Sequence, residues 1–281
     1  MIKFGQSGNS EAFYNAGNVD SVLSPKWVKD MGLDCFEYSF GRGVNLSSKK
    51  AEEIGKAFSD LGVEISVHCP YFINFASPEE EKIQNSYNYV LSSLKMGKIM
   101  GAKRAVFHPG AQGKLSREEA YNKTNESLKV LADKIYENKF DDMIVCPETM
   151  GKSAQIGTVL EVANFCTLAP FYYPCVDFGH VNSLWQGKLK APSDYLEIFD
   201  TLESKNGFEK VKNMHVHFSK IMYSAKGEVK HLTFEDTEYG PNPIDFLTAV
   251  KQRGLTPFIL SESAGTQDID AKIMKDIYNS L

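Results

Sequence analysis

Short runs of β-branched and aromatic residues recur eight times along the 281-residue chain, and stretches with helical periodicity separate most of them. The expected strands are residues 2–5, 35–40, 64–69, 105–108, 143–148, 175–177, 213–218 and 257–262. The expected helices are residues 47–61, 78–100, 116–136, 154–166, 192–202 and 243–253. Because parallel strands need helical crossovers and eight of them close a sheet, the alternation predicts an α/β fold, a (β/α)8 TIM barrel in which residues 1–281 form a single domain. A doubly wound open sheet is the structural alternative.

One connection is longer than the others. Residues 218–242 separate the seventh strand from the next helix, and we expect them to form an irregular functional loop.

Residues 1–17 contain no charged-then-apolar leader, and no run of about 18 or more apolar residues follows. We therefore expect a cytoplasmic monomer with no membrane partner. The five cysteines are odd in number and form no CxxC pair, which argues against a disulfide framework and predicts buried core thiols.

All six histidines fall at the end of an expected strand or in the loop that follows it: His68, His108, His180, His215, His217 and His231. Glu148, Asp177 and Glu262 occupy equivalent positions. The C-terminal ends of all barrel strands surround one mouth, so ligands distant in sequence converge there. Imidazole and carboxylate groups bind zinc and similar first-row metals, and four of them saturate a tetrahedral zinc. The surplus therefore predicts two or three metals that share a bridging carboxylate.

The net charge of −5 would by itself disfavour a nucleic-acid partner, because phosphate binding depends on positive charge. Three divalent metals would change the net charge to +1 and concentrate positive charge where a phosphate would bind. The charge therefore does not exclude a nucleic-acid substrate.

Five segments resemble, in order, the signature segments of the endonuclease IV family. They are residues 67–74 (VHCPYFIN), 107–110 (FHPG), 147–149 (PET), 176–180 (VDFGH) and 214–217 (MHVH), and the resemblance extends to Glu262. Members of that family are TIM-barrel enzymes of the xylose-isomerase-like superfamily with three zinc ions, and they incise DNA at abasic sites. The resemblance implies a zinc-dependent phosphodiester hydrolase that incises double-stranded DNA 5′ to abasic sites in base excision repair, with manganese as the alternative metal.

Carried over residue by residue, the family pattern implies three metal sites. One zinc is held by His68, His108 and Glu148, and a second by Glu148, Asp177, His215 and Glu262, so that Glu148 bridges them. The family's third zinc takes a histidine that matches His180 and an Asp-x-His pair. His231 fits the histidine of that pair, but the aspartate position holds Val229. We therefore expect the third metal to bind weakly or not at all, although Glu228 and His217 lie near enough in sequence to offer a donor.

The catalytic groups implied by the resemblance are Glu148 and Glu262, which orient the attacking water between the metals. Tyr71, Asn74 and Arg42 match positions that contact or enter the DNA beside the lesion. Residues 5–18 do not match the first strand and loop of the family.

Two other functions remain open from the sequence. A single-metal sugar isomerase or epimerase could use Glu148, Asp177, His215 and Glu262, and a metal-stabilised DNA-lesion binder would need no turnover. Neither the isomerase nor the epimerase needs His68, His108, His180 and His231. This surplus of histidines favours the hydrolase.

Overall fold

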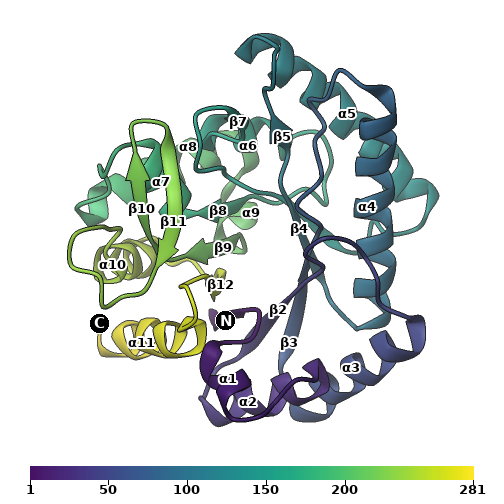
Figure 1. The fold of residues 1–281 in the computed structure, drawn as a ribbon. Helices are drawn as coiled ribbons and strands as arrows, with labels where there is room; N and C mark the ends of the chain where they lie inside the picture. Colours follow the sequence, from purple (N-terminus) through teal and green to yellow (C-terminus); the bar gives the residue numbers. More distant parts are fainter.

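Eight parallel strands form the centre of the computed structural model, which describes residues 1–281 (Figure 1). They are β1 (Lys3–Ser7), β2 (Cys35–Ser39), β3 (Glu64–His68), β4 (Arg104–Phe107), β6 (Ile144–Pro147), β8 (Cys175–Asp177), β9 (His215–Phe218) and β12 (Phe258–Ser261). The hydrogen-bonded order is β6-β4-β3-β2-β1-β12-β9-β8, and single parallel bridges between Val145 and Tyr172 and between Glu148 and Cys175 join its two edges. The barrel and all eight expected strands are confirmed, and the open-sheet alternative is wrong.

Helices surround the barrel. The longer ones are α3 (Ser48–Leu61), α4 (Glu80–Ile99), α5 (Arg117–Glu137), α8 (Pro192–Asn206), α10 (Pro243–Arg253) and α11 (Gln267–Ser280). The shorter ones are α1 (Glu11–Asn15), a 3-10 turn (Ser21–Leu23), α2 (Ser24–Asp30), α6 (Val159–Phe165), α7 (Phe178–Leu184) and α9 (Phe208–Lys212). Capping residues set several boundaries. Ser47 accepts a hydrogen bond from the Lys50 amide at the start of α3, and Gly62 ends that helix in the left-handed conformation.

The helix expected over residues 154–166 is shorter in the structure. Thr158 caps α6, and Glu161 closes the capping box, so the helix begins only at Val159. The preceding residues form β7 (Gln155–Ile156), which pairs with β5 (Gly110–Ala111). The local cap therefore overrides the longer periodic pattern.

The side chains between the sheet and the helices form a continuous apolar core that includes Phe178, Phe218 and Phe246. All five cysteines are buried and unpaired, as expected. None of the helices is both long enough and apolar enough to cross a membrane.

The long connection after β9 is not irregular throughout, so that expectation is wrong in part. It contains an antiparallel hairpin of β10 (Lys220–Ser224) and β11 (Gly227–Leu232), which lies beside α7 in Figure 1. The hairpin turn docks on the loop after β6, where the Glu228 amide donates to the Gly151 carbonyl at 2.9 Å. Gly227 has φ +96°, and a Cβ there would lie 2.1 Å from the Gly151 oxygen. This close approach requires glycine and holds Glu228 at the barrel mouth.

Candidate metal centre

Glu148 lies at the C-terminal end of β6 with only 1% of its surface exposed. Its Oε2 is 3.2 Å from Nε2 of His68 and 3.2 Å from Nε2 of His108. Its Oε1 faces the opposite side and lies 3.2 Å from Nδ1 of His217. The two oxygens of one carboxylate therefore face two different sets of donors.

Three groups of possible ligands meet at the barrel mouth, and within each group the donor atoms lie within 4.8 Å of one another. The first ligand group is His68, His108 and Glu148; the second is Glu148, Asp177, His217 and Glu262; the third is His180, Glu228 and His231. Members of all three groups line one cavity of about 450 Å³, together with Tyr71, Lys152 and Gln155. The barrel thus brings together residues that are spread over most of the chain.

Hydrogen bonds determine which ring nitrogen of three histidines faces the other donors. In each case Nδ1 is engaged: with the Cys69 carbonyl for His68 (2.8 Å), the Thr149 carbonyl for His180 (2.9 Å) and the Ser219 hydroxyl for His231 (2.8 Å). A carbonyl can only accept, so Nδ1 of His68 and of His180 carries a proton and Nε2 is left with the lone pair. Such outer partners are typical of metal-binding histidines.

Asp177 provides the clearest sign that the site is suited to a cation. Its Oδ1 accepts from the His180 amide at 2.7 Å and caps α7, but its buried Oδ2 has no hydrogen-bond partner. A buried carboxylate oxygen without a partner is destabilising, and burial raises the pKa of Asp177. The ligand set of imidazoles and carboxylates fits zinc or a similar divalent metal.

When no metal is bound, protons on the histidines offset part of the negative charge of the neighbouring carboxylates. Burial lowers the pKa of His68, but its hydrogen bond to Glu148 and the charge of that carboxylate outweigh burial and raise the pKa to about 9. Burial also opposes protonation of His180, but Asp177 and Glu148 raise its pKa to about 10. Metal ions and protons therefore compete for the same nitrogens.

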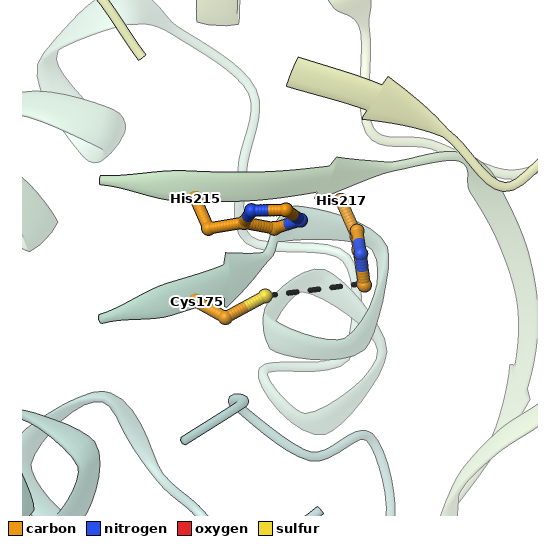
Figure 2. Close-up of side chains that lie close together, drawn as sticks. All are labelled: Cys175, His215 and His217. Carbon is orange, nitrogen blue, oxygen red and sulfur yellow. Dashed lines mark hydrogen bonds between the residues drawn. The ribbon is translucent and has the colours of Figure 1, made fainter. Parts of the chain in front are cut away.

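The expected ligand His215 does not lie in the second ligand group, and His217 takes that position. Both residues point into the barrel from β9, because residues two apart share a face of a strand (Figure 2). His215 lies deeper, with its ring stacked on Phe258 at a centroid distance of 5.3 Å. Burial is the main cause that lowers the pKa of His215 to about 4. His215, predicted as a ligand of the second zinc, is therefore a neutral core side chain that lies outside the three ligand groups.

Cys175 on β8 lies beside these two histidines in Figure 2, with its Sγ 3.9 Å from Nδ1 of His217. The three residues bring their donor atoms within 4.8 Å of one another. Burial raises the pKa of the Cys175 thiol well above its usual value. This group is fully buried below the cavity and none of its members lines it, so it is distinct from the three ligand groups at the barrel mouth.

The third ligand group contains a carboxylate, Glu228, from a position next to the one that holds aspartate in the family pattern. Oε2 of Glu228 lies 3.6 Å from Nε2 of His180, and its Oε1 lies 3.9 Å from Nε2 of His231. Val229, at the position expected to hold aspartate, is 53% exposed. The β10–β11 hairpin thus brings Glu228 to the position that the sequence left without a donor.

Sequence reasoning missed Glu37, which is fully buried in the middle of β2. Its Oε1 accepts from Nε2 of His217 at 2.8 Å, and its Oε2 accepts from Ser66 Oγ at 3.0 Å. Burial raises the pKa of Glu37, but the charge of His217 and the close approach of both neighbouring histidine rings outweigh burial and hold it well below its usual value. A glutamate inside an otherwise apolar strand (CFEYS) was the available signal.

The three expected substrate residues differ in their surroundings. Tyr71 is 57% exposed and lines the cavity, with its ring centroid 5.9 Å from that of His68. Asn74 instead uses its side-chain oxygen to accept from the Ala76 and Ala111 amides at 3.1 and 3.0 Å, which ties two loops together. Arg42 is exposed and does not line the cavity.

A family model and two proteins with similar sequences show what the chain resembles. The family model for xylose isomerase-like TIM barrels matches residues 25–275. An uncharacterized protein of Methanocaldococcus jannaschii is 30% identical over 286 residues, which cover 100% of this chain and 98% of that protein. A probable endonuclease 4 of Mycoplasmopsis synoviae is 27% identical over 234 residues, or 82% of this chain and 79% of the relative.

Two solved structures share the barrel. A D-tagatose 3-epimerase-like protein has a TM-score of 0.73 at 18% identity, covering 99% of each chain. Endonuclease IV from Thermus thermophilus has a TM-score of 0.72 at 17% identity, covering 99% of this chain and all of that one. At these identities both structures support the fold alone, and they do not discriminate between the two activities.

Proposed function

Because this chain belongs to the family of xylose isomerase-like TIM barrels, in which its relatives include probable endonuclease 4 proteins, we propose that it is a zinc-dependent endonuclease. Its proposed reaction is hydrolysis of the phosphodiester 5′ to an abasic site in double-stranded DNA. The observation that supports this is the number of ligand groups: two further groups lie beside the four-residue group that would suffice for one metal. Phosphoryl transfer is the reaction class that most often uses paired metals.

The first and second ligand groups would hold two zinc ions and the third group a third, with manganese as the alternative metal. When bound, such ions supply Lewis acidity, which activates water near neutral pH and neutralises charge on the phosphate. Glu148 has one oxygen toward each of the first two groups, so it sets the spacing between them. Glu262 lies at the cavity wall. Burial raises the pKa of Glu262, but the charge of His217 outweighs burial and lowers it, so its carboxylate is ionised and can orient the attacking water.

Residues around the cavity offer contacts suited to a nucleic acid. Tyr71 and Phe72 are adjacent exposed aromatics, 57% and 59% accessible, at the end of β3. Aromatic side chains in such positions can stack on bases or wedge between them, which costs a few kcal/mol of base unstacking. Lys152 lines the cavity, and Arg42 is exposed in the loop after β2; both could contact phosphates. In this proposal Asn74 acts indirectly, by holding the loop that carries the two aromatic residues.

A sugar isomerase or epimerase is the second candidate, and the second ligand group favours it. Glu148, Asp177, His217 and Glu262 form a complete four-ligand site by themselves. Such an enzyme would leave the first group's two histidines and the whole third group without a role. A DNA-lesion binder without turnover is the third candidate.

Counting metals and measuring incision together distinguishes these functions. The purified chain is analysed for its metals and then incubated with a duplex that carries one abasic analogue, beside the same duplex without it. Two or three zinc ions per chain with incision 5′ to the analogue support the proposal. One manganese ion with ketose epimerisation and no incision supports the second candidate, and tight lesion binding without incision supports the third. The Glu148→Gln variant is the control for contaminating nucleases.

A further inference from the structure

His217 is oriented differently from the other buried histidines of the three ligand groups. His68 and His180 donate from Nδ1 to backbone carbonyls and present Nε2 to the cavity. In His217 the roles are reversed: Nε2 lies 2.8 Å from Oε1 of Glu37, and Nδ1 lies 3.2 Å from Oε1 of Glu148. The partner that fixes this orientation is a buried carboxylate, not a carbonyl group.

We propose that Glu37 is a positioning residue that makes His217 bind metal through Nδ1 and sets the metal affinity of the second ligand group. This inference rests on the metal centre of the proposed function, but not on the DNA substrate. An ionised carboxylate can only accept, so the contact with Glu37 keeps a proton on Nε2 of His217, and Nδ1 is the nitrogen left to bind a metal. A carboxylate partner also increases the basicity of the imidazole, and loss of such a partner typically weakens metal binding by roughly 10- to 100-fold.

The surroundings of Glu37 hold its carboxylate in place. Ser66 on the neighbouring strand β3 donates to Oε2 at 3.0 Å, and Ser7 on β1 donates to Oε1 at 3.4 Å. Nε2 of His215 lies 3.1 Å from Oε2, one layer below the metal centre. Glu37 is thus fixed from three strands and can hold the His217 ring in a single orientation.

This arrangement also explains why His217, and not His215, is the histidine of β9 that can bind the metal. Glu37 contacts both rings, but only His217 has its other nitrogen beside Glu148 and Glu262. His215 is packed on Phe258, and neither of its ring nitrogens makes a hydrogen bond. The position of Glu37 therefore joins a structural histidine to a ligand histidine.

The test compares zinc binding by the full chain and its Glu37→Gln variant, which keeps the shape of the side chain and removes its charge. A chelator titration should show that one zinc site weakens by roughly 10- to 100-fold while the others are unchanged. Anomalous scattering from crystals at partial chelation should place the loss at the second ligand group. His215→Gln is the matched control, because it removes the other histidine on Glu37 and should leave all zinc affinities within about twofold.

A spectroscopic readout separates positioning from general support of the fold. Nitrogen-15 spectra of the histidine rings in the zinc-loaded wild type, assigned with His217→Gln, should show the His217 proton on Nε2 and the metal on Nδ1. This measurement decides the inference even if Glu37→Gln fails to fold. Glu37→Asp, which retains the charge, should restore part of the affinity that Glu37→Gln loses.

Two results would overturn the inference: a zinc-loaded His217 that carries its proton on Nδ1, or a folded Glu37→Gln variant that keeps every zinc site within about twofold of wild type. These readouts need no DNA. A protein with the expected His217 tautomer that does not incise the abasic duplex would reject the proposed function and leave the role of Glu37 standing. Incision by the wild type, together with a Glu37→Gln variant whose zinc affinities are unchanged, would support the proposed function and reject the role of Glu37.

Discussion

Nε2 of His180 in α7 lies 3.6 Å from Oε2 of Glu228 in the hairpin, although 48 residues of sequence separate them. A Cβ on Gly151 would lie 2.8 Å from both Cβ of Glu228 and Cδ2 of His180. The absence of a side chain at Gly151 therefore allows Glu228 and His180 to approach each other. The third ligand group depends on this contact and not on the aspartate position of the family pattern.

Gly151→Ala should empty the third ligand group and leave the first two loaded, because the added methyl group pushes Glu228 and His180 apart. Zinc stoichiometry should fall by one, as it should in Glu228→Gln. Val229→Ala is the control, since that side chain is half exposed and faces no ligand. Full occupancy in Gly151→Ala would show that the hairpin can shift without losing the ligand.

The third ligand group should also release its metal first under mild chelation. It has three donors, whereas the second group has four. The first group also has three, but its His108 and Glu148 side chains are 21% and 1% exposed, against 26% and 15% for His231 and Glu228 in the third. Fewer ligands and easier access for water both weaken binding. Anomalous scattering near His180 should therefore decline before scattering near Glu148. Simultaneous loss from all groups would contradict this order.

Glu148→Gln should reduce incision by far more than tenfold, and by far more than it weakens the fold. This carboxylate faces both the first and the second ligand group, and an amide removes the charge that serves them. Steady-state incision rates and urea unfolding of the metal-free proteins measure the two effects separately. A residual rate within about tenfold of wild type, or about 1.4 kcal/mol, would contradict a bridging role.

Removal of metal by a strong chelator should abolish activity and preserve the fold. The apolar core between the barrel and its helices contains no ligand residue, so folding does not depend on metal as it does in a zinc finger. Far-ultraviolet circular dichroism before and after chelation provides the measurement. Loss of the helical signal would show that the ions are structural.

The metal-free protein should lose stability as the pH rises from about 6.5 toward 10. His68 and His180 have folded-state pKa values of about 9 and about 10, above the unfolded value of about 6.5. Raised pKa values stabilise the fold fully below the unfolded value, and this contribution is lost as the pH rises through the folded values. His215 has a lowered folded-state pKa of about 4, so its contribution to stability is lost as the pH falls below about 6.5. Urea unfolding of the chelated protein across this range tests the sign, and a flat profile would contradict it.

Much of the fold follows from local sequence. Strand periodicity, caps such as Ser47 and the even spacing of elements predicted the barrel correctly, because each depends on residues close together in the chain. The placement of histidines and acids at strand ends also follows from sequence, since a parallel barrel brings all those ends to one mouth. Sequence alone therefore determined which surface holds the ligand groups.

Only the tertiary structure decided which side chains make up each group. His215 and His217 share a face of β9 and are equivalent in the sequence pattern, but one is packed against Phe258 in the core and the other reaches Glu148. Glu228 reaches His180 because the hairpin docks on Gly151 and packs against α7. Glu37 contacts His217 across 180 residues of sequence. Depth in the barrel, docking of the hairpin and contacts between distant strands arise from packing of the whole chain, so no local pattern encodes them.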